Sequence, residues 1–292
     1  MNTLRETRCL LSDLADRLIN LFKWPFAAIA IFFVPSSFLA CWSSILHLVR
    51  SSSLIPFLLG IAAFWLVNKV MRRTSIWAWL GVLEHEIVHL LLGLACFKIP
   101  NRWRVTSKGG HVGFDRGSNW IITISPYVLP LIPLLTFVSI QSLAAFSPLK
   151  SWVLPACMGF SMAMHIAFTW MESDYRQPDI QRIGGLFSIL VAPTLHVIFV
   201  AVVLILSSSS SISAIGHLSN LFQQIGQNGF VGWKAFVYHG SEFIFSKATA
   251  VAPGSAASAA SGIRFGSGSA IVPAFGPVRV GVWVLAVRTL PE

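Results

Sequence analysis

Hydrophobic residues along this chain gather into long runs that short polar segments separate. A helix needs about 20 consecutive apolar residues to cross the hydrocarbon core of a bilayer. The fourth of these runs, residues 119–146, contains Pro126, Pro130 and Pro133, and prolines at this density bend or break a helix. The pattern predicts about six transmembrane helices, at residues 24–46, 54–71, 75–97, 119–146, 150–171 and 186–206.

The polar segment at residues 98–118 has a different pattern, because its apolar and polar positions alternate on both sides of Lys108-Gly109-Gly110. Alternation around a glycine-containing turn predicts a short β-hairpin, although a basic loop between helices would also fit. A hairpin edge can pair with an extended peptide. The residues that would present a substrate in this way are Gly109, Gly110, His111 and Val112. His111 could also be a metal ligand, but we interpret it as a polar group of the hairpin.

The two ends of the chain differ from its middle. Leucines recur at helical spacing in residues 1–23, which predicts an amphipathic helix that either lies on a membrane surface or is a solvated arm. After Leu206 a serine run begins, and residues 248–270 are rich in Ala, Ser and Gly. We therefore divide the chain into an N-terminal amphipathic arm (1–23), a transmembrane domain (24–206) and a flexible C-terminal tail (207–292).

Composition supports a membrane protein. Hydrophobic residues make up 55% of the chain and charged residues only 11%, whereas a soluble domain has about 25% charged residues. The fold class that we expect is an all-α polytopic membrane protein with one short β-hairpin. The net charge of +10 comes from short Lys and Arg clusters between the apolar runs, which suits anionic headgroups of a lipid bilayer better than nucleic acid. The four cysteines show no paired spacing, so no disulfide framework is predicted.

Charge does not settle the orientation of the chain in a membrane. Lys and Arg number eight in residues 1–23, 69–75 and 147–151, and eight in residues 47–53, 98–118 and 172–183 on the other side. The positive-inside rule is therefore silent. If the hairpin enters the membrane, its charges do not count, and the N-terminus is then expected on the cytoplasmic side.

The third apolar run contains the motif His85-Glu86-Ile87-Val88-His89. Residues four apart share one face of a helix, so His85 and His89 can bind one metal ion together. Glu86 can reach a water molecule on that ion and act as general base. Ionisable side chains in an apolar span are costly and indicate a functional site. We therefore expect one Zn²⁺ per chain at this motif, and we assign Glu84, which points to another side of the helix, no catalytic role.

A catalytic zinc site usually has three protein ligands, so one more residue must join the two histidines. Spacing alone leaves Asp179, Asp174, Glu172 and His165 open as the third ligand. The acidic residues begin where one apolar run ends and continue into the next, so they could meet the metal-binding helix. His165 and Glu172 could instead orient a ligand or line a polar cleft, and a plain helix-to-helix hydrogen bond is the simpler interpretation of His165.

These features together resemble the site-2-protease family of intramembrane zinc metallopeptidases. The resemblance covers residues 75–206: the H-E-x-x-H helix, the Gly-Gly hairpin, the proline-broken run and a late aspartate at a helix start. It implies that Asp179, in Gln177-Pro178-Asp179-Ile180, is the third zinc ligand. The chain lacks the Leu-Asp-Gly and Asn-x-x-Pro motifs and an inserted peptide-binding domain, so it resembles a compact, divergent branch.

The resemblance implies a multi-pass protein of the bacterial inner (plasma) membrane that cuts a membrane-anchored protein substrate. In that interpretation the chain is a zinc metalloendopeptidase with Glu86 as the general base. Two other functions remain open. A membrane transporter could use the same His and Asp cluster as a transit site for metal ions, although no internal repeat is evident, and a catalytically inactive scaffold could retain the motif.

Overall fold

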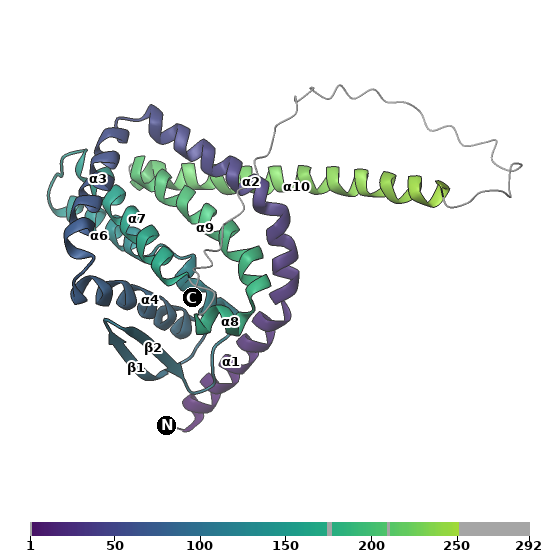
Figure 1. The fold of residues 1–292 in the computed structure, drawn as a ribbon, viewed down its shortest axis with the longest axis horizontal. Helices are drawn as coiled ribbons and strands as arrows, with labels where there is room; N and C mark the ends of the chain where they lie inside the picture. Colours follow the sequence, from purple (N-terminus) through teal and green to yellow (C-terminus); the bar gives the residue numbers. More distant parts are fainter. Residues whose placement is uncertain (1, 174–176, 209–210, 251–292) are drawn as a thin grey trace, which may run out of the picture. The chain divides into compact units, whose positions relative to one another are not determined.

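Figure 1 shows a computed structural model of the chain, which describes residues 2–173, 177–208 and 211–250. Helices and a single two-stranded sheet make up the described residues. In chain order the elements are α1 (Asn2–Leu21), α2 (Lys23–Arg50), α3 (Leu54–Met71), α4 (Ser75–Ala95), β1 (Pro100–Thr106), β2 (Gly109–Phe114), α5 (Trp120–Ile124), the 3-10 helix η1 (Ser125–Tyr127), α6 (Leu131–Phe146), α7 (Val153–Glu172), α8 (Pro178–Ile183), α9 (Gly185–Ser208) and α10 (Ser211–Ala250).

Every predicted apolar run is helical in the structure. Helices α2, α3, α4, α7 and α9 are each long and apolar enough to cross a membrane. The run at residues 119–146 is broken, because its two halves, Trp120–Tyr127 and Leu131–Phe146, meet at an angle of 73°. Proline has no backbone N–H and clashes with a preceding turn, so Pro126 and Pro130 lie where the helix cannot continue. The mostly helical fold with five or six candidate spans is thus confirmed.

The predicted hairpin is also confirmed. Strands β1 and β2 are antiparallel, with Thr106 opposite Gly109 and Trp103 opposite Val112, so a two-residue turn at Ser107 and Lys108 joins them. The hairpin packs on α4, where a Cβ atom on Gly93 would lie only 2.2 Å from Cζ of Phe114. The absence of a side chain at Gly93 therefore lets the hairpin lie directly on the metal-motif helix.

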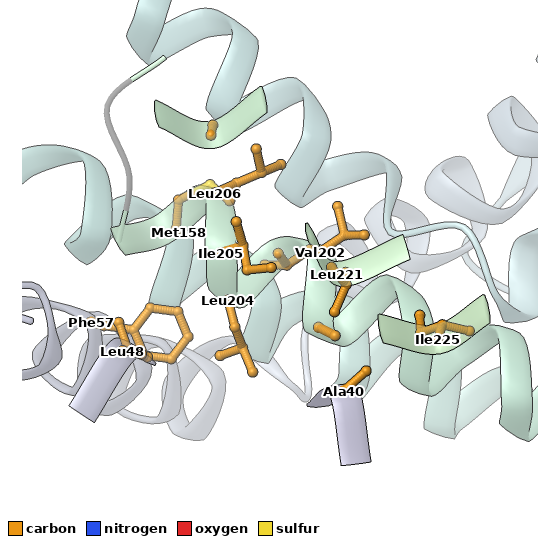
Figure 2. Packing of buried hydrophobic residues seen from close by; sticks show 13 residues of the cluster. Ala40, Leu48, Phe57, Met158, Val202, Leu204, Ile205, Leu206, Leu221 and Ile225 are labelled. Atoms are coloured by element: carbon orange, nitrogen blue, oxygen red, sulfur yellow. The ribbon is translucent and has the colours of Figure 1, made fainter. Parts of the chain in front are cut away.

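The largest hydrophobic cluster joins five helices (Figure 2). Its side chains come from α2, α3, α7, α9 and α10: Ala40, Leu48, Phe57, Met158, Ala201, Val202, Val203, Leu204, Ile205, Leu206, Ala214, Leu221 and Ile225. Helices α3 and α7 approach closely beside this cluster. A Cβ atom on Gly60 would lie 1.9 Å from the carbonyl oxygen of Ala156, and one on Gly159 would lie 2.0 Å from that of Phe57. Small residues permit this approach, as is common where apolar helices cross.

The packed part of the chain extends past residue 206, where our sequence analysis ended the transmembrane domain. Ala214, Leu221 and Ile225 of α10 are buried in the cluster just described. They recur at helical spacing among polar residues. This weak periodicity is the sequence signal for a packed helix after the serine run. Residues 251–292, about half of the predicted tail, lie outside the described residues. The chain divides by its internal contacts into residues 1–241 and 242–292, and all the features discussed below lie in the first unit.

The helix expected in residues 1–23 is present as α1, and its polar side faces the rest of the chain. Asp16 accepts hydrogen bonds from Nζ of Lys98 at 2.6 Å and from Nδ2 of Asn119 at 3.0 Å. Asp13 pairs with Arg116. The leucines on the other side, Leu10, Leu14 and Leu18, are exposed. Helix α1 is therefore held by ion pairs to the chain segments on both sides of the hairpin, while its apolar face points outward.

Candidate metal centre

Helix α4 determines how the two histidines and Glu86 are placed. The helix begins after Thr74, whose side chain accepts a hydrogen bond from the backbone N–H of Trp77 at 3.3 Å. Threonine is a favoured residue at this position because its oxygen satisfies a backbone donor that the helix leaves free. From this start the helix is continuous to Ala95, so the side chains of His85 and His89 lie one turn apart on the same face.

Asp179, in the first turn of α8, completes a group of three potential metal ligands. Its Oδ2 atom lies 2.8 Å from Nε2 of His89 and 3.4 Å from Nε2 of His85, and the two Nε2 atoms are 3.1 Å apart. Their ligand atoms all lie within 4.8 Å of one another, and no other group of three potential metal ligands is found among the described residues. The choice of Asp179 among the four open residues agrees with this geometry.

The spacing and chemistry of the three donor atoms fit zinc. Bonds of about 2.0–2.2 Å at tetrahedral angles place neighbouring ligand atoms about 3.3–3.6 Å apart. The observed separations, 2.8 to 3.4 Å, are at or slightly below this range, so a small outward movement would admit the ion. Two imidazoles and a carboxylate are a ligand set that zinc takes in catalytic sites.

Each of the two imidazole rings makes a further contact that orients it. The Nδ1–H of His89 donates to the carbonyl oxygen of Ile122 in α5 at 2.8 Å, which leaves Nε2 free to bind a metal. The ring of His85 meets the ring of Tyr127 edge-on, with centroids 5.3 Å apart. Sequence reasoning missed both supports. A backbone carbonyl has no sequence signal, and Tyr127 could have been suspected only because it lies within the proline-rich break.

Asp179 is the anionic member of the group. It lies in α8, which is too short to span a membrane. Burial alone would raise the pKa of the Asp179 carboxyl. The hydrogen bonds and charge of His85 and His89 outweigh burial and hold that pKa well below its usual range. The side chain is therefore a carboxylate, which is the form that binds a metal.

Glu86 is buried beside these ligands, with a relative exposure of 5%. Its Oε2 atom has no hydrogen-bond partner in the described part of the chain. The backbone of Gly110 in β2 lies against it, because a Cβ atom there would be 2.5 Å from Cγ and 2.6 Å from Oε1 of Glu86. An unpaired buried carboxylate is costly, and functional sites are where such groups are retained.

The group opens into a cavity of about 440 Å³. All four residues that we named as substrate-presenting, Gly109 to Val112, line it, so the hairpin forms one wall of the site. Glu172 also lines the cavity, and it accepts a hydrogen bond from Nε2 of Gln177 at 2.9 Å. Lys108 and Arg182 also line this cavity. A polar, open cavity of this size can admit both water and a peptide segment.

Two of the other candidate ligands, Glu172 and His165, are not part of the three-residue ligand group. His165 does not line the cavity, because its Nδ1 atom is 2.9 Å from Oε1 of Glu84 and its face of α7 is turned toward that residue. The helix-to-helix hydrogen bond that we considered for His165 is thus what the structure shows. Asp174 lies outside the described residues.

Comparison of the chain with protein-family models, with curated proteins and with solved structures gives no match. The function must therefore be inferred from the residues and the geometry of the site itself.

Proposed function

We propose that this chain is a membrane-embedded zinc metalloprotease that hydrolyses a peptide bond of a membrane-anchored protein. One observation carries the proposal. His85, His89 and Asp179 bring two imidazoles and a carboxylate together beside the buried, unpaired carboxylate of Glu86, at the edge of an open cavity. Three ligands and an adjacent general base are the parts that metal-assisted peptide hydrolysis requires.

The chain's own residues then have defined tasks. His85, His89 and Asp179 would hold the zinc, which when bound supplies a Lewis acid that acidifies water and polarises the peptide carbonyl. Glu86 accepts a proton from the attacking water as its oxygen bonds to the carbonyl carbon. As the C–N bond breaks, Glu86 returns that proton to the amine nitrogen, so the products are a carboxylic acid and an amine.

The location in a membrane is part of the proposal and rests on the five or six helices that are long and apolar enough to span one. The broken run at α5 and α6 supports it as well. A backbone freed of helical hydrogen bonds is tolerated at membrane depth only where protein or a wet cavity surrounds it. Ile122, in the first half of that run, lines the 440 Å³ cavity. The resemblance of residues 75–206 to the site-2-protease family supports the same function.

The hairpin indicates how a substrate would bind. Strand β2 pairs with β1 on one side only, since the sheet has two strands within the described residues. Its residues Gly109 to Val112 face the cavity that contains Glu86. An extended peptide could pair with this strand by backbone hydrogen bonds, which would fix its scissile bond near the zinc ligands.

A Glu86→Gln variant tests the mechanism. The amide keeps the shape of the side chain but cannot accept the proton of water, so the variant should retain one zinc per chain and lose cleavage by at least about 100-fold. Zinc is measured by elemental analysis of protein purified in detergent. Cleavage is measured by mass spectrometry of single-span reporter proteins reconstituted with it. Asp115, an exposed residue that follows strand β2, provides the matched control, and Asp115→Asn should cleave normally.

Cleavage by Glu86→Gln at the wild-type rate would exclude the proposed mechanism. Wild-type protein that moves zinc across liposomes without cutting any reporter would favour the transporter function. Protein that contains no zinc when purified without chelator would favour an inactive scaffold.

A further inference from the structure

A second buried polar group lies on another side of helix α4, and the proposed proteolysis makes no use of it. Glu84 and His165 are 8% and 3% exposed, and the Nδ1–H of His165 donates to Oε1 of Glu84 at 2.9 Å. The other ring nitrogen of His165, Nε2, is buried and has no hydrogen-bond partner in the described part of the chain. A buried imidazole with one free nitrogen needs a partner of some kind.

His196 of α9 is the nearest candidate to share that partner. Its ring is nearly parallel to that of His165, at an angle of 18°, and the ring centroids are 5.8 Å apart. The Nδ1–H of His196 donates to the carbonyl oxygen of Tyr127 at 3.3 Å. Each ring is thus held at Nδ1 by an oxygen acceptor, and in that tautomer each Nε2 atom carries the lone pair that can bind a metal. Imidazoles that bind metals are usually held in this way.

The two rings line a small cavity of about 10 Å³, which has room for a single atom or water molecule. Met162 also lines it, and the other lining residues are apolar. Met162 and His165 are three residues apart on α7, so they share a helix face. The cavity therefore has two imidazoles and a thioether around it, and these groups come from two helices.

We infer that this cavity is a binding site for one Cu(I) ion, held by Nε2 of His165, Nε2 of His196 and Sδ of Met162. Neutral imidazole and thioether donors form a soft ligand set, which selects Cu(I) over the harder divalent ions. With metal–nitrogen bonds of about 2.0 Å, two imidazoles on one ion have centroids about 5.5 Å apart at a trigonal angle and about 6.3 Å apart in line. The observed separation of 5.8 Å is close to these values, and the two stacked rings would have to turn for both Nε2 atoms to point at the ion.

The single negative charge beside this site also favours a monovalent cation such as Cu(I). Glu84 is the one carboxylate in hydrogen-bond contact with this group among the described residues. A monovalent cation at Nε2 of His165 would balance that single buried charge through the ring, whereas a divalent cation would leave one positive charge uncompensated in an apolar setting. The site would join α4, α7 and α9, and it does not depend on whether the chain is a protease.

Titration of the full-length, zinc-loaded chain with Cu(I) under anaerobic, reducing conditions tests this site. A competing chelator, bicinchoninate, reports the affinity. Thiols bind Cu(I) themselves, so the free cysteines Cys9, Cys41, Cys96 and Cys157 are first replaced by alanine in every variant. The expected result is one Cu(I) per chain. X-ray absorption should show nitrogen neighbours and one sulfur neighbour, while the zinc content stays at one per chain so that copper is not counted at His85 and His89.

Two variants and a control locate the ion. His196→Gln and Met162→Leu should each weaken Cu(I) binding by at least about tenfold. Met162→Leu should also remove the sulfur neighbour, and its nearly unchanged volume keeps the fold intact. Met164 lies on the same helix but does not line the cavity, so Met164→Leu should bind as the unmodified chain does. Absence of bound Cu(I), or binding that both His196→Gln and Met162→Leu leave unchanged, would overturn the inference and leave the cavity with a water molecule at most.

Discussion

At the scale of single residues, the unpaired carboxylate of Glu86 and the bare backbone of Gly110 depend on each other. The glycine approaches Glu86 so closely that no other residue fits without displacing one of the two. Gly110 lies against Cγ and Oε1 of Glu86, while Oε2 has no hydrogen-bond partner in the described part of the chain. A general base needs this combination, because it must be fixed in position and still be able to accept a proton.

Replacement of Gly110 by alanine tests that contact. The added Cβ atom would lie 2.5 Å from Cγ of Glu86, so we expect Glu86 or the hairpin to shift and cleavage of the reporter to fall by about 10- to 100-fold with zinc retained. Gly185→Ala is the control, because a Cβ atom there would meet no other atom within 4 Å. Equal activity of Gly110→Ala and the wild type would show that the contact does not position the base.

Asp179 is expected to be the third metal ligand, and Asp179→Asn removes its charge with little change of shape. Because a carboxylate binds zinc far better than an amide, the variant should lose zinc affinity by at least about tenfold in a competition titration with a chelator. Glu172→Gln should keep its zinc, since Glu172 does not belong to the ligand group. A reversed outcome would move the third ligand to Glu172.

The sequence predicted the residues of the site unequally, for a physical reason. His85, Glu86 and His89 lie within one helical turn, so local helix geometry alone predicts their common site. Asp179 is 90 residues from His89 in the chain, and its position depends on how α8 packs, which spacing cannot reveal. The carbonyl oxygen of Ile122 acts through the backbone, so no sequence pattern marks it.

At the scale of elements, helices α3 and α7 form one of the closest contacts in the chain. Gly60 and Gly159 each face a backbone carbonyl of the other helix at a distance that excludes a side chain. Helix α7 also carries His165 and ends at Glu172 in the cavity wall, so this crossing helps to fix the position of a helix that borders the site. The apolar runs predicted these helices well, whereas the broken run was foreseen only from its prolines.

Gly60→Ala tests the crossing. The new Cβ atom would lie 1.9 Å from a backbone oxygen, which cannot rotate away as a side chain could, so we expect a loss of stability of about 1–3 kcal/mol. The melting temperature in detergent measures it. Gly81→Ala is the matched control, since its Cβ atom would make an ordinary contact of 3.5 Å with the ring of Phe168. An unchanged melting temperature for Gly60→Ala would mean that the helices can separate at little cost.

At the scale of the whole molecule, the described residues expose many large apolar side chains. Large hydrophobic side chains are exposed along α2, α3, α6 and α9, including Phe38, Trp65, Val138 and Ile189. Exposed apolar side chains on helices of this length and composition are compatible with a protein that lies in a bilayer. Composition predicted this property, because it depends on the sum of residues and not on their arrangement.

Extraction of isolated membranes with alkaline carbonate tests the proposed location. Proteins bound by charge alone are released at high pH, whereas proteins whose helices cross the bilayer remain with the lipid. We expect the full-length chain to stay in the membrane pellet, as measured by immunoblotting with a peripheral protein as the released control. Its complete appearance in the supernatant would contradict the membrane assignment.

The ion pairs that tie helix α1 to the ends of the hairpin have one further consequence. Asp16 binds Lys98 just before β1, and Asp13 binds Arg116 just after β2, while the leucines of α1 face outward. If those leucines rest in the headgroup layer, the position of α1 determines how far below the lipid surface the hairpin holds a substrate. The cut would then fall at a fixed depth in the bilayer rather than at a fixed sequence, and bilayer thickness would help select which bond is broken.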